Sequence, residues 1–411
     1  MKKQKNEIFF AAAAGAIALA GSSPAFAGEY GKTVIDDKNP VADTSWCDLF
    51  KKNKLYEGDG FIKSVKFKGR YHGQWISQTE DTLSNGSATT NGYHEFQSRR
   101  LRLGTEIEMA HNLTLSATFN VSDGSGGAGS HSLVTGPFFD DWDEVFVEWA
   151  PSDDFYILAG KTKQKITVEN KTSSNNILTI ERSPITNAVI SNKPWGVAVG
   201  FEALGISHEI GGWISGADRD STDDRYDWAD FDSRGSLTYR NSMDITEATE
   251  LQFGYQFTNN SGGTASPAGY ADENLGSAFE HVASLATLST FGSFGLITDL
   301  IYAANGLGTG TLSDGFDTAG LVIMPYYDIT DKLQLVTRYA FMGQGREQRP
   351  QRYDTRRTVE DYHTFYAGFN YYVCKHNLKL MAGYEYATGD IHDTSNSVET
   401  GTWMLGVRTS W

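Results

Sequence analysis

The sequence contains no apolar run long enough to cross a membrane as a helix. The longest run, from Ile8 to Ala20, falls short of the roughly eighteen residues that a helical span requires. This shortage excludes a helical membrane protein. Prolines are also few, 9 against 43 glycines, and apolar residues make up only 39% of the chain. A large soluble core would be poorly supplied by this composition, whereas a barrel with a water-filled interior tolerates it.

The first 27 residues have the composition of an export signal. Three lysines precede the apolar run, and Ala25-Phe26-Ala27 offers the small-x-small pattern of a cleavage site. The sequence therefore predicts a signal peptide over 1–27 and a mature chain that begins at Gly28. Two kinds of exported protein remain open, a secreted soluble β protein and an outer-membrane barrel.

Cysteine is nearly absent, with only Cys47 and Cys374 in the chain. An exported protein meets an oxidising compartment, so one disulfide is one expectation and two unpaired thiols are the other. Cys374 falls in a predicted tight turn, and Cys47 lies in the segment before the first predicted strand. A bridge between them would pin the N-terminal segment to the floor of a barrel.

Positive charge is in deficit. The chain has 35 Lys and Arg against 51 Asp and Glu, which gives a formal net charge of −16. Removing the predicted signal peptide, which carries three Lys and one Glu, makes the net charge −18. Taken alone, this balance disfavours anionic substrates, but selectivity depends on where the charges lie.

From Phe61 to Trp411 the chain reads as about sixteen segments in which apolar and polar residues alternate over roughly ten positions. In the last segment, the odd-numbered residues from Trp403 to Trp411 are mostly apolar, and the even-numbered residues from Gly406 to Ser410 are not. A membrane-spanning strand needs about 9–11 residues with this alternation. The predicted strands are 61–77, 95–109, 113–122, 143–150, 155–164, 195–204, 206–215, 232–240, 247–258, 279–289, 293–303, 316–327, 333–342, 361–373, 378–388 and 401–411.

The connections between these segments alternate between short and long. Eight long and seven short connections leave both ends of the barrel on the short side, as an even-stranded bacterial barrel requires and a β-sandwich does not. The predicted fold is all-β, a transmembrane antiparallel β-barrel over 61–411 in the outer membrane of a Gram-negative-type bacterium. Residues 28–60 do not alternate and are expected to form a periplasmic N-terminal segment.

The first predicted strand carries the clearest chemical signal. Its odd-numbered positions from Val65 to Trp75 are apolar, aromatic or glycine, while its even-numbered positions include Lys66, Lys68 and Arg70. Lys and Arg cost about 2–4 kcal/mol each on the lipid face at mid-depth, so these cations are expected in the lumen. The same argument places further cations inside, namely Arg100 and Arg102 on the second strand, Lys161, Lys163 and Lys165 on one parity of the fifth, and Arg338, Lys379 and Arg408 on later strands.

Two interpretations of these cations remain open. Rings or ladders of Arg and Lys build pores for anions and phosphate. Alternatively, the lumen is generic and carries mixed charge, with the cations balanced by carboxylates such as Glu106, Glu144, Glu148 and Glu385.

The third long connection, roughly 165–194, is about thirty residues long and unusually polar, and a loop of that length in a compact barrel is usually functional. It is expected to fold inward and narrow the pore, with Lys165, Lys171 and Arg182 near the constriction. The alternative is an extracellular loop that covers the mouth. Two other loops, the acidic 216–231 and the basic 343–360, are interpreted either as solvated loops or as substrate-capturing ones, and no metal site is expected.

Two stretches resemble the phosphate- and pyrophosphate-selective porin family. The first is Arg99-Arg100-Leu101-Arg102-Leu103-Gly104. The second runs from Ala159-Gly160-Lys161 through Thr172-Ser173-Ser174-Asn175-Asn176 to Glu181-Arg182-Ser183. The resemblance implies a sixteen-stranded homotrimer in which the third long loop narrows the channel and arginines and lysines guide anions inward. It also implies that Arg99 and Arg100 are the family's tandem arginines and that Lys161 and Lys163 are its fifth-strand lysines, although Arg99 has the outward parity in the predicted register.

Other classes of function have less support. The nucleophile-elbow pattern G-x-S-x-G does not occur, and the G-x-G-x-x-G match at Gly124, Gly126 and Gly129 joins two predicted strands with no helix to receive a phosphate. An enzyme is therefore not expected, and neither is a cofactor.

The predicted function is an outer-membrane porin, a passive diffusion channel for small hydrophilic solutes with a cationic lumen that favours anions, phosphate among them. The alternatives are a general or cation-selective porin and a non-conducting structural or adhesive barrel. Expected partners are outer-membrane lipid, small anions and further copies of the chain in a homotrimer, but no nucleic acid. The residues expected to attract anions are Lys66, Lys68, Arg70, Arg100, Arg102, Lys161, Lys163, Lys165 and Arg182.

Overall fold

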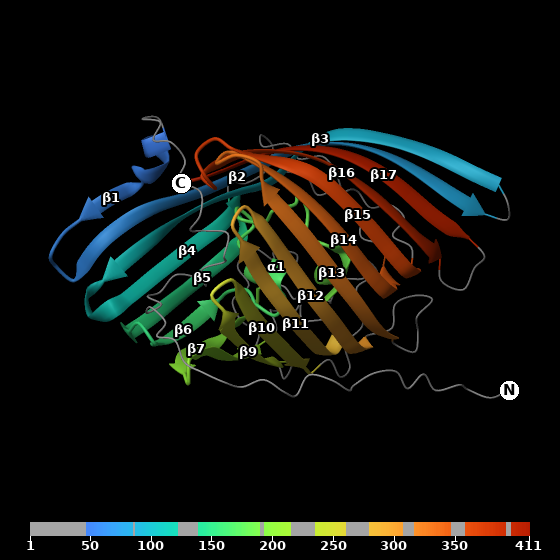
Figure 1. Cartoon of the computed structure of the whole chain (residues 1–411). Coiled ribbons are helices and arrows are strands. Elements are labelled where there is room, and N and C mark those ends of the chain that lie inside the picture. The colour runs from blue at the N-terminus through green and yellow to red at the C-terminus, as the bar shows by residue number, and fades with distance from the viewer. Residues whose placement is uncertain are drawn as a thin grey trace.

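The computed structural model describes residues 47–84, 87–121, 139–189, 193–214, 235–259, 279–306, 316–346, 358–391 and 396–411. In this part of the chain, sixteen antiparallel strands follow one another in sequence order from β2 (Ile62–Ser84) to β17 (Ser397–Ser410). The two end strands pair with each other, from Ser410↔Arg70 to Ser397↔Leu83, and so close the barrel (Figure 1). The predicted transmembrane β-barrel of about sixteen strands is confirmed.

The intervening barrel strands match the predicted segments one for one. They are β3 (Ser87–Met109), β4 (Leu113–Val121), β5 (Phe139–Ser152), β6 (Phe155–Lys161), β7 (Trp195–Ala203), β8 (Ile206–Ile214), β9 (Gly235–Thr246), β10 (Thr249–Thr258), β11 (Phe279–Phe291), β12 (Phe294–Gly306), β13 (Phe316–Asp328), β14 (Leu333–Arg346), β15 (Thr358–Tyr372) and β16 (Leu378–Ile391).

Alternation along each strand separates a lipid-facing side from a lumen-facing side. In β17, Trp403 and Leu405 are exposed on the outer surface, whereas Thr402 and Met404 are buried inside. In β2, the outward Trp75 is exposed, and the inward His72 and neighbouring even-numbered residues are buried or half-buried. The predicted registers of the first and last strands are therefore confirmed.

The first hairpin differs from the prediction. The expected long connection 78–94 is wrong, because β2 and β3 remain paired as far as Ser84↔Ser87. Each strand has 23 residues, which at about 3.3 Å per residue is roughly 75 Å. β4 pairs with β3 only from Arg102 to Met109, so the rest of the hairpin projects beyond that neighbour (Figure 1). The projecting part is polar on both faces and so lacks the alternation that marks a spanning strand.

The N-terminal segment is attached to the barrel at the end where the connections are short. The 3₁₀ helix η1 (Cys47–Lys51) and strand β1 (Lys54–Glu57) precede the barrel, and β1 pairs with β2. A disulfide joins Cys47 to Cys374, which lies between β15 and β16, with a Cα–Cα distance of 5.4 Å. Of the two alternatives left open by the sequence, the bridge is the one observed.

Three sequence predictions lie outside the described residues. They are the signal peptide 1–27, the whole acidic loop 216–231 and residues 347–357 of the basic loop. Among the residues that are described, no helix combines the length and the apolar character needed to cross a membrane.

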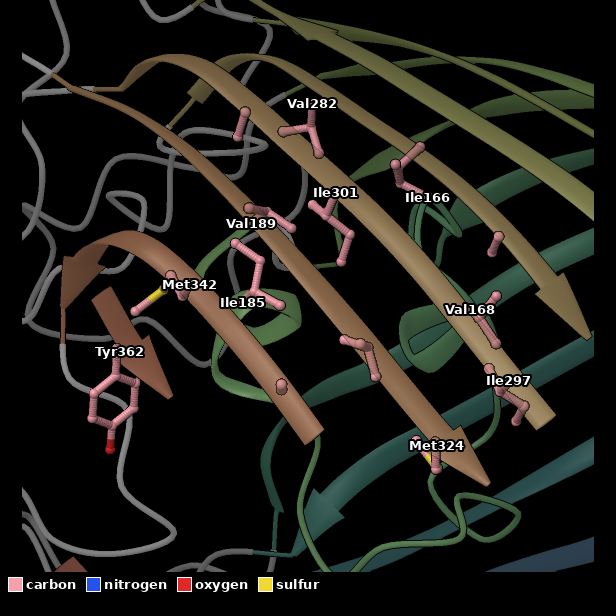
Figure 2. Close-up of a cluster of buried hydrophobic side chains, with 14 of the residues drawn as sticks. Ile166, Val168, Ile185, Val189, Val282, Ile297, Ile301, Met324, Met342 and Tyr362 are labelled. Atoms are coloured by element: carbon pink, nitrogen blue, oxygen red, sulfur yellow. The ribbon is translucent and has the colours of Figure 1, made fainter. Parts of the chain in front are cut away.

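Part of the inner wall carries a cluster of apolar side chains. Val282, Ile301 and Met342 belong to a buried cluster that extends from β11 to β17 on the inside of the barrel. Figure 2 shows that Ile166 and Ile185, from the segment between β6 and β7, point toward these side chains. Burial of this apolar surface from water provides the driving force that holds the segment against the wall.

Candidate functional site

The segment between β6 and β7 occupies the interior of the barrel. Residues 162–189 and 193–194 are described, and they contain the short helices α1 (Val168–Lys171) and α2 (Pro184–Val189). Figure 1 shows α1 inside the barrel. The expected inward folding of the third long connection is confirmed. The alternative, a loop that covers the mouth, is wrong.

Two glycines of the wall let this segment approach closely. A Cβ atom on Gly254 would lie 2.2 Å from the carbonyl oxygen of Ile166, and one on Gly320 would lie 2.4 Å from the side chain of Ile185. Both distances are well inside van der Waals contact. The lumen segment therefore sits directly on the backbone of β10 and β13.

Four buried polar side chains on consecutive strands, β14 to β17, hold the backbone of residues 174–181. Arg408 donates to the carbonyl oxygens of Ser174 (2.5 Å) and Ile180, Lys379 to that of Ile177 (2.7 Å), Asn370 to that of Leu178 (2.8 Å) and Arg338 to that of Glu181 (2.8 Å). The three cations of this row were expected on inward faces, and they lie there. Their donors bind carbonyl groups and fix the position of the segment.

Arg338 is the centre of a second set of contacts. Its Nη1 atom lies 3.1 Å from Glu169 Oε1, and its Nη2 atom lies 2.7 Å from Glu385 Oε2. It also donates to the hydroxyl of Thr179 at 3.1 Å. The Arg338 side chain is only 1% exposed, so these contacts operate with little screening by water. They join α1 of the lumen segment to β14 and β16.

The polar stretch Thr172–Asn176 binds the first barrel strand. Arg70 Nη1 donates to Ser174 Oγ at 2.7 Å, and His72 Nε2 lies 2.8 Å from Asn175 Oδ1. The serines and asparagines that mark the family resemblance thus act as partners for β2. Arg70, expected to attract anions, is half-buried beside them.

A β-bulge brings two adjacent arginines to the lumen. His72 pairs with Arg100 and Gly73 pairs with Ser98, so Arg99 is an extra residue in β3. The extra residue reverses the parity of the strand at this point, and Arg99 and Arg100 therefore both face inward. The outward parity expected for Arg99 is wrong. A bulge depends on the partner strand, and parity counted along one strand cannot reveal it.

Glu181 of the lumen segment meets these arginines. Arg99 Nε lies 2.8 Å from Glu181 Oε1, and Gln74 Nε2 donates to the same oxygen at 3.1 Å. Burial opposes ionisation of this carboxyl group, but the guanidinium groups of Arg99 and Arg100 outweigh that effect and lower its pKa to about 2. Glu181 is therefore ionised under all physiological conditions.

A cavity of about 200 Å³ lies beside this cluster, toward the end of the barrel that carries the short connections. Its lining includes Lys68, Arg70 and Arg102 as well as the carboxylates Asp143 and Glu144. Arg102 Nη2 lies 2.9 Å from Asp143 Oδ1, and Lys193 pairs with the same carboxylate. Two cations thus share Asp143. The sequence analysis did not identify Lys193 as a lumen residue. It lies in the loop between β6 and β7, where the alternation of strand positions gives no information.

Lys66 and Lys68 face the lumen as expected, but both are paired. Lys66 Nζ lies 3.1 Å from Glu106 and 2.5 Å from Glu108, and Lys68 Nζ lies 2.9 Å from Glu106. In this part of the lumen the mixed-charge interpretation describes the structure better than a cationic path. The carboxylates responsible, Glu106 and Glu108, are two residues apart and so share one face of the second predicted strand, which could be recognised in the sequence.

The three lysines expected on one parity of the fifth strand separate in the structure. β6 ends at Lys161, which lies directly opposite Val145 and Trp195 and shares their outward face. The inward position predicted for Lys161 is wrong. Lys163 and Lys165 lie beyond the strand end, inside the barrel, where strand parity no longer applies.

The remaining predicted cations belong to the lumen segment. Lys163 Nζ donates to the carbonyl oxygens of Asn170 and Lys171 at 2.9 and 2.8 Å, and burial together with the nearby Arg182 lowers its pKa well below the usual value. Arg182 donates to the carbonyl oxygen of Glu169 at 2.7 Å. Lys165 pairs with Glu209 of β8 at 3.1 Å. No metal-binding group of acidic, His or Cys side chains occurs in the described part of the chain.

Comparison with known proteins agrees with this architecture. Residues 66–265 match the family described as phosphate-selective porin O and P. Among solved structures, the outer membrane channel DcaP of Acinetobacter baumannii has a TM-score of 0.56 at 10% identity, covering 87% of this chain and 99% of the channel. An anion-selective porin from Comamonas acidovorans has a TM-score of 0.50 at 11% identity, covering 85% and 99%. No curated protein sequence matches the chain.

The family match includes the tandem arginines, the lumen segment and the strands from β3 to β10. The structural likenesses, at such low identity, show the fold alone. Porin family and barrel fold together indicate a channel rather than an enzyme, and they locate the protein in a Gram-negative outer membrane. The chain is an outer-membrane porin, and its residues 66–265 match the family of phosphate-selective porins O and P.

Proposed function

We propose that this porin is a passive diffusion channel that favours small anions, with phosphate as the leading candidate solute, and that it works as a homotrimer. The observation that carries the proposal is the concentration of arginine where the lumen segment faces β2 and β3. Arg70, Arg99, Arg100, Arg102 and Arg182 gather there around the carboxylates Glu181 and Asp143.

The pairing pattern supports a positive potential at this point. Asp143 is shared by Arg102 and Lys193, and Glu181 binds Arg99 while Arg100 lies close to it. Lys193 also lies 3.6 Å from Glu144, and Arg70 lies beside Asp143 and Glu144. Three carboxylates therefore face at least five cations. Charge of one sign in a narrow water-filled passage raises the local concentration of the opposite ion. Guanidinium groups also match the geometry of phosphate, because their planar fork can bind two oxygens at once.

The distribution of charge along the lumen favours one location for selectivity. Lys66 and Lys68 are neutralised by Glu106 and Glu108, and Arg338, Lys379 and Arg408 are bound to the lumen segment. Of the two groups of described residues beside β2 and β3, the arginine cluster is the one in which cations outnumber carboxylates. The proposal includes no chemical step, since these groups provide attraction and hydrogen bonds during transit.

The test is the reversal potential of the purified protein in a planar bilayer under a KCl gradient, followed by addition of inorganic phosphate to compete for the chloride current. Chloride selectivity with block by phosphate is expected. Arg100→Gln should reduce the anion-to-cation permeability ratio several-fold, because it removes charge from the cluster. The matched control Lys66→Gln should change the ratio less, because Lys66 already shares its charge with two carboxylates. Cation selectivity of the unaltered protein would refute the proposal.

A further inference from the structure

We propose that Glu181 is a tethered competitor of the permeating anion. Its carboxylate occupies the arginine site that an entering oxyanion would use, and it thereby decides which anions the channel can bind. The inference rests on the proposed anion function and adds a specificity-determining residue to it.

The first support is the position of the carboxylate. Glu181 Oε1 accepts from Arg99 at 2.8 Å and from Gln74 at 3.1 Å, an arrangement of donors that would suit an oxygen of a free anion equally well. The Glu181 side chain is 12% exposed, but that of Arg99 is 41% exposed. One side of the site is therefore accessible from the water of the lumen.

The second support is a donor that Glu181 leaves without a partner. The Nη1 atom of Arg100 is buried and, among the described residues, has no hydrogen-bond partner. Its electrostatic neighbours are Arg99, Glu181, Arg102 and Arg182, three cations and one carboxylate. A buried donor without a partner is costly, and it marks a site that its present occupant does not complete.

The third support is that the carboxylate can leave without the loop. The carbonyl oxygen of Glu181 accepts from Arg338 Nη1 at 2.8 Å and from Thr179 Oγ1 at 2.7 Å. These bonds fix the backbone of Glu181 and do not involve its carboxylate. Rotation about side-chain bonds is enough to vacate the site, and such rotation is fast compared with a rearrangement of the lumen segment.

These three features select a class of ligand. Displacing Glu181 means breaking its ion pair with Arg99, so the incoming anion must supply more than one negative charge or more than one oxygen. A doubly charged tetrahedral oxyanion does both, because it can replace the carboxylate on Arg99 and also accept from Arg100. Chloride is a single acceptor with one charge and leaves Glu181 in place. Competition by the tethered group thus favours multivalent oxyanions over halides.

The experiment measures block of the chloride current by inorganic phosphate and, separately, by sulfate, for the unaltered protein and for Glu181→Gln. Removal of a tethered competitor should lower the inhibition constant for both oxyanions by about tenfold, since the effective concentration of a tethered group is in the millimolar range. Glu106→Gln is the matched control, because it removes the same charge from a carboxylate that binds Lys66 and Lys68. It should change the constant by less than about twofold, since it perturbs only the general lumen potential.

A second variant tests position separately from charge. Glu181→Asp keeps the carboxylate but withdraws it by one methylene from Arg99, so an inhibition constant between those of the unaltered protein and Glu181→Gln is expected. Equal effects of Glu181→Gln and Glu106→Gln, or weaker block in Glu181→Gln, would overturn the inference. If the unaltered protein is anion-selective and blocked by phosphate while Glu181→Gln leaves the constant unchanged, this inference fails and the proposed function stands. If the unaltered protein is cation-selective and phosphate does not block its current, the proposed function itself is refuted.

Discussion

Replacing Arg338 with methionine should detach the lumen segment from its wall. The side chain is 1% exposed and makes four contacts, to Glu169, Glu385, Thr179 and the carbonyl oxygen of Glu181, at 2.7 to 3.1 Å. Methionine is similar in length and apolar, so it fills most of the space but leaves two buried carboxylates without their shared cation.

The magnitude follows from those two carboxylates. Removing one partner of a buried ion pair costs about 3–5 kcal/mol, because the remaining charge is neither paired nor hydrated. A change of that size shifts the equilibrium between the docked and the undocked segment by a factor of roughly 10²–10⁴. We therefore expect Arg338→Met to lower the free energy of unfolding by several kcal/mol and to make the open-channel current noisy.

The assay combines guanidinium-induced unfolding of the folded barrel in detergent with single-channel recording in a planar bilayer. Arg338→Met/Glu385→Met should recover part of the lost stability, because it removes one of the uncompensated charges and leaves Glu169 with its Ser183 donors. Lys54→Met, at the exposed ion pair with Glu57, is the control and should cost less than about 1 kcal/mol. If Arg338→Met is no more destabilising than Lys54→Met and its current is as quiet as that of the unaltered protein, the anchoring argument is refuted.

Three further predictions concern the same architecture. Burial lowers the pKa of Lys171 to about 8, so its positive charge is present below that pH and is lost above it. Anion selectivity should therefore fall between pH 7 and 9. Lys171→Gln should flatten this part of the profile of reversal potential against pH. Gly254→Leu should displace the lumen segment and change the single-channel conductance, because even a Cβ atom there would lie 2.2 Å from the Ile166 carbonyl oxygen. The control Gly60→Leu should leave the conductance unchanged, because a Cβ atom at that position meets nothing within 4 Å. Cys47→Ser should make η1 and β1 susceptible to limited proteolysis, because the disulfide that ties them to Cys374 is lost. Conductance should stay the same, because the barrel is closed by the pairing of β17 with β2. Loss of the closed barrel in this variant would contradict the prediction.

Local pattern was enough to predict the strands. Side chains alternate between the two faces of any strand, so the apolar positions of β2 and β17 identified the lipid face without knowledge of their neighbours. Lys66, Lys68, Arg70, Arg100 and Arg102 were placed in the lumen on this basis, and the structure puts them there. The alternation of short and long connections likewise predicted the number of strands, and with it the side of the barrel on which the first strand begins and the last strand ends.

The tertiary structure decided which of these charges remain available. Arg408 has the inward parity that the sequence predicts, but only the folded lumen segment brings the Ser174 carbonyl oxygen within 2.5 Å of it. Lys161 lies outward because β6 ends there, and Arg99 lies inward because β2 forces a bulge into β3. Parity is a property of one strand, whereas bulges, ion pairs and the docking of a loop depend on residues far apart in the chain. The sequence alone therefore determined the barrel and the faces of most of its strands, and the pairing of distant residues determined where in the lumen an anion would find unoccupied charge.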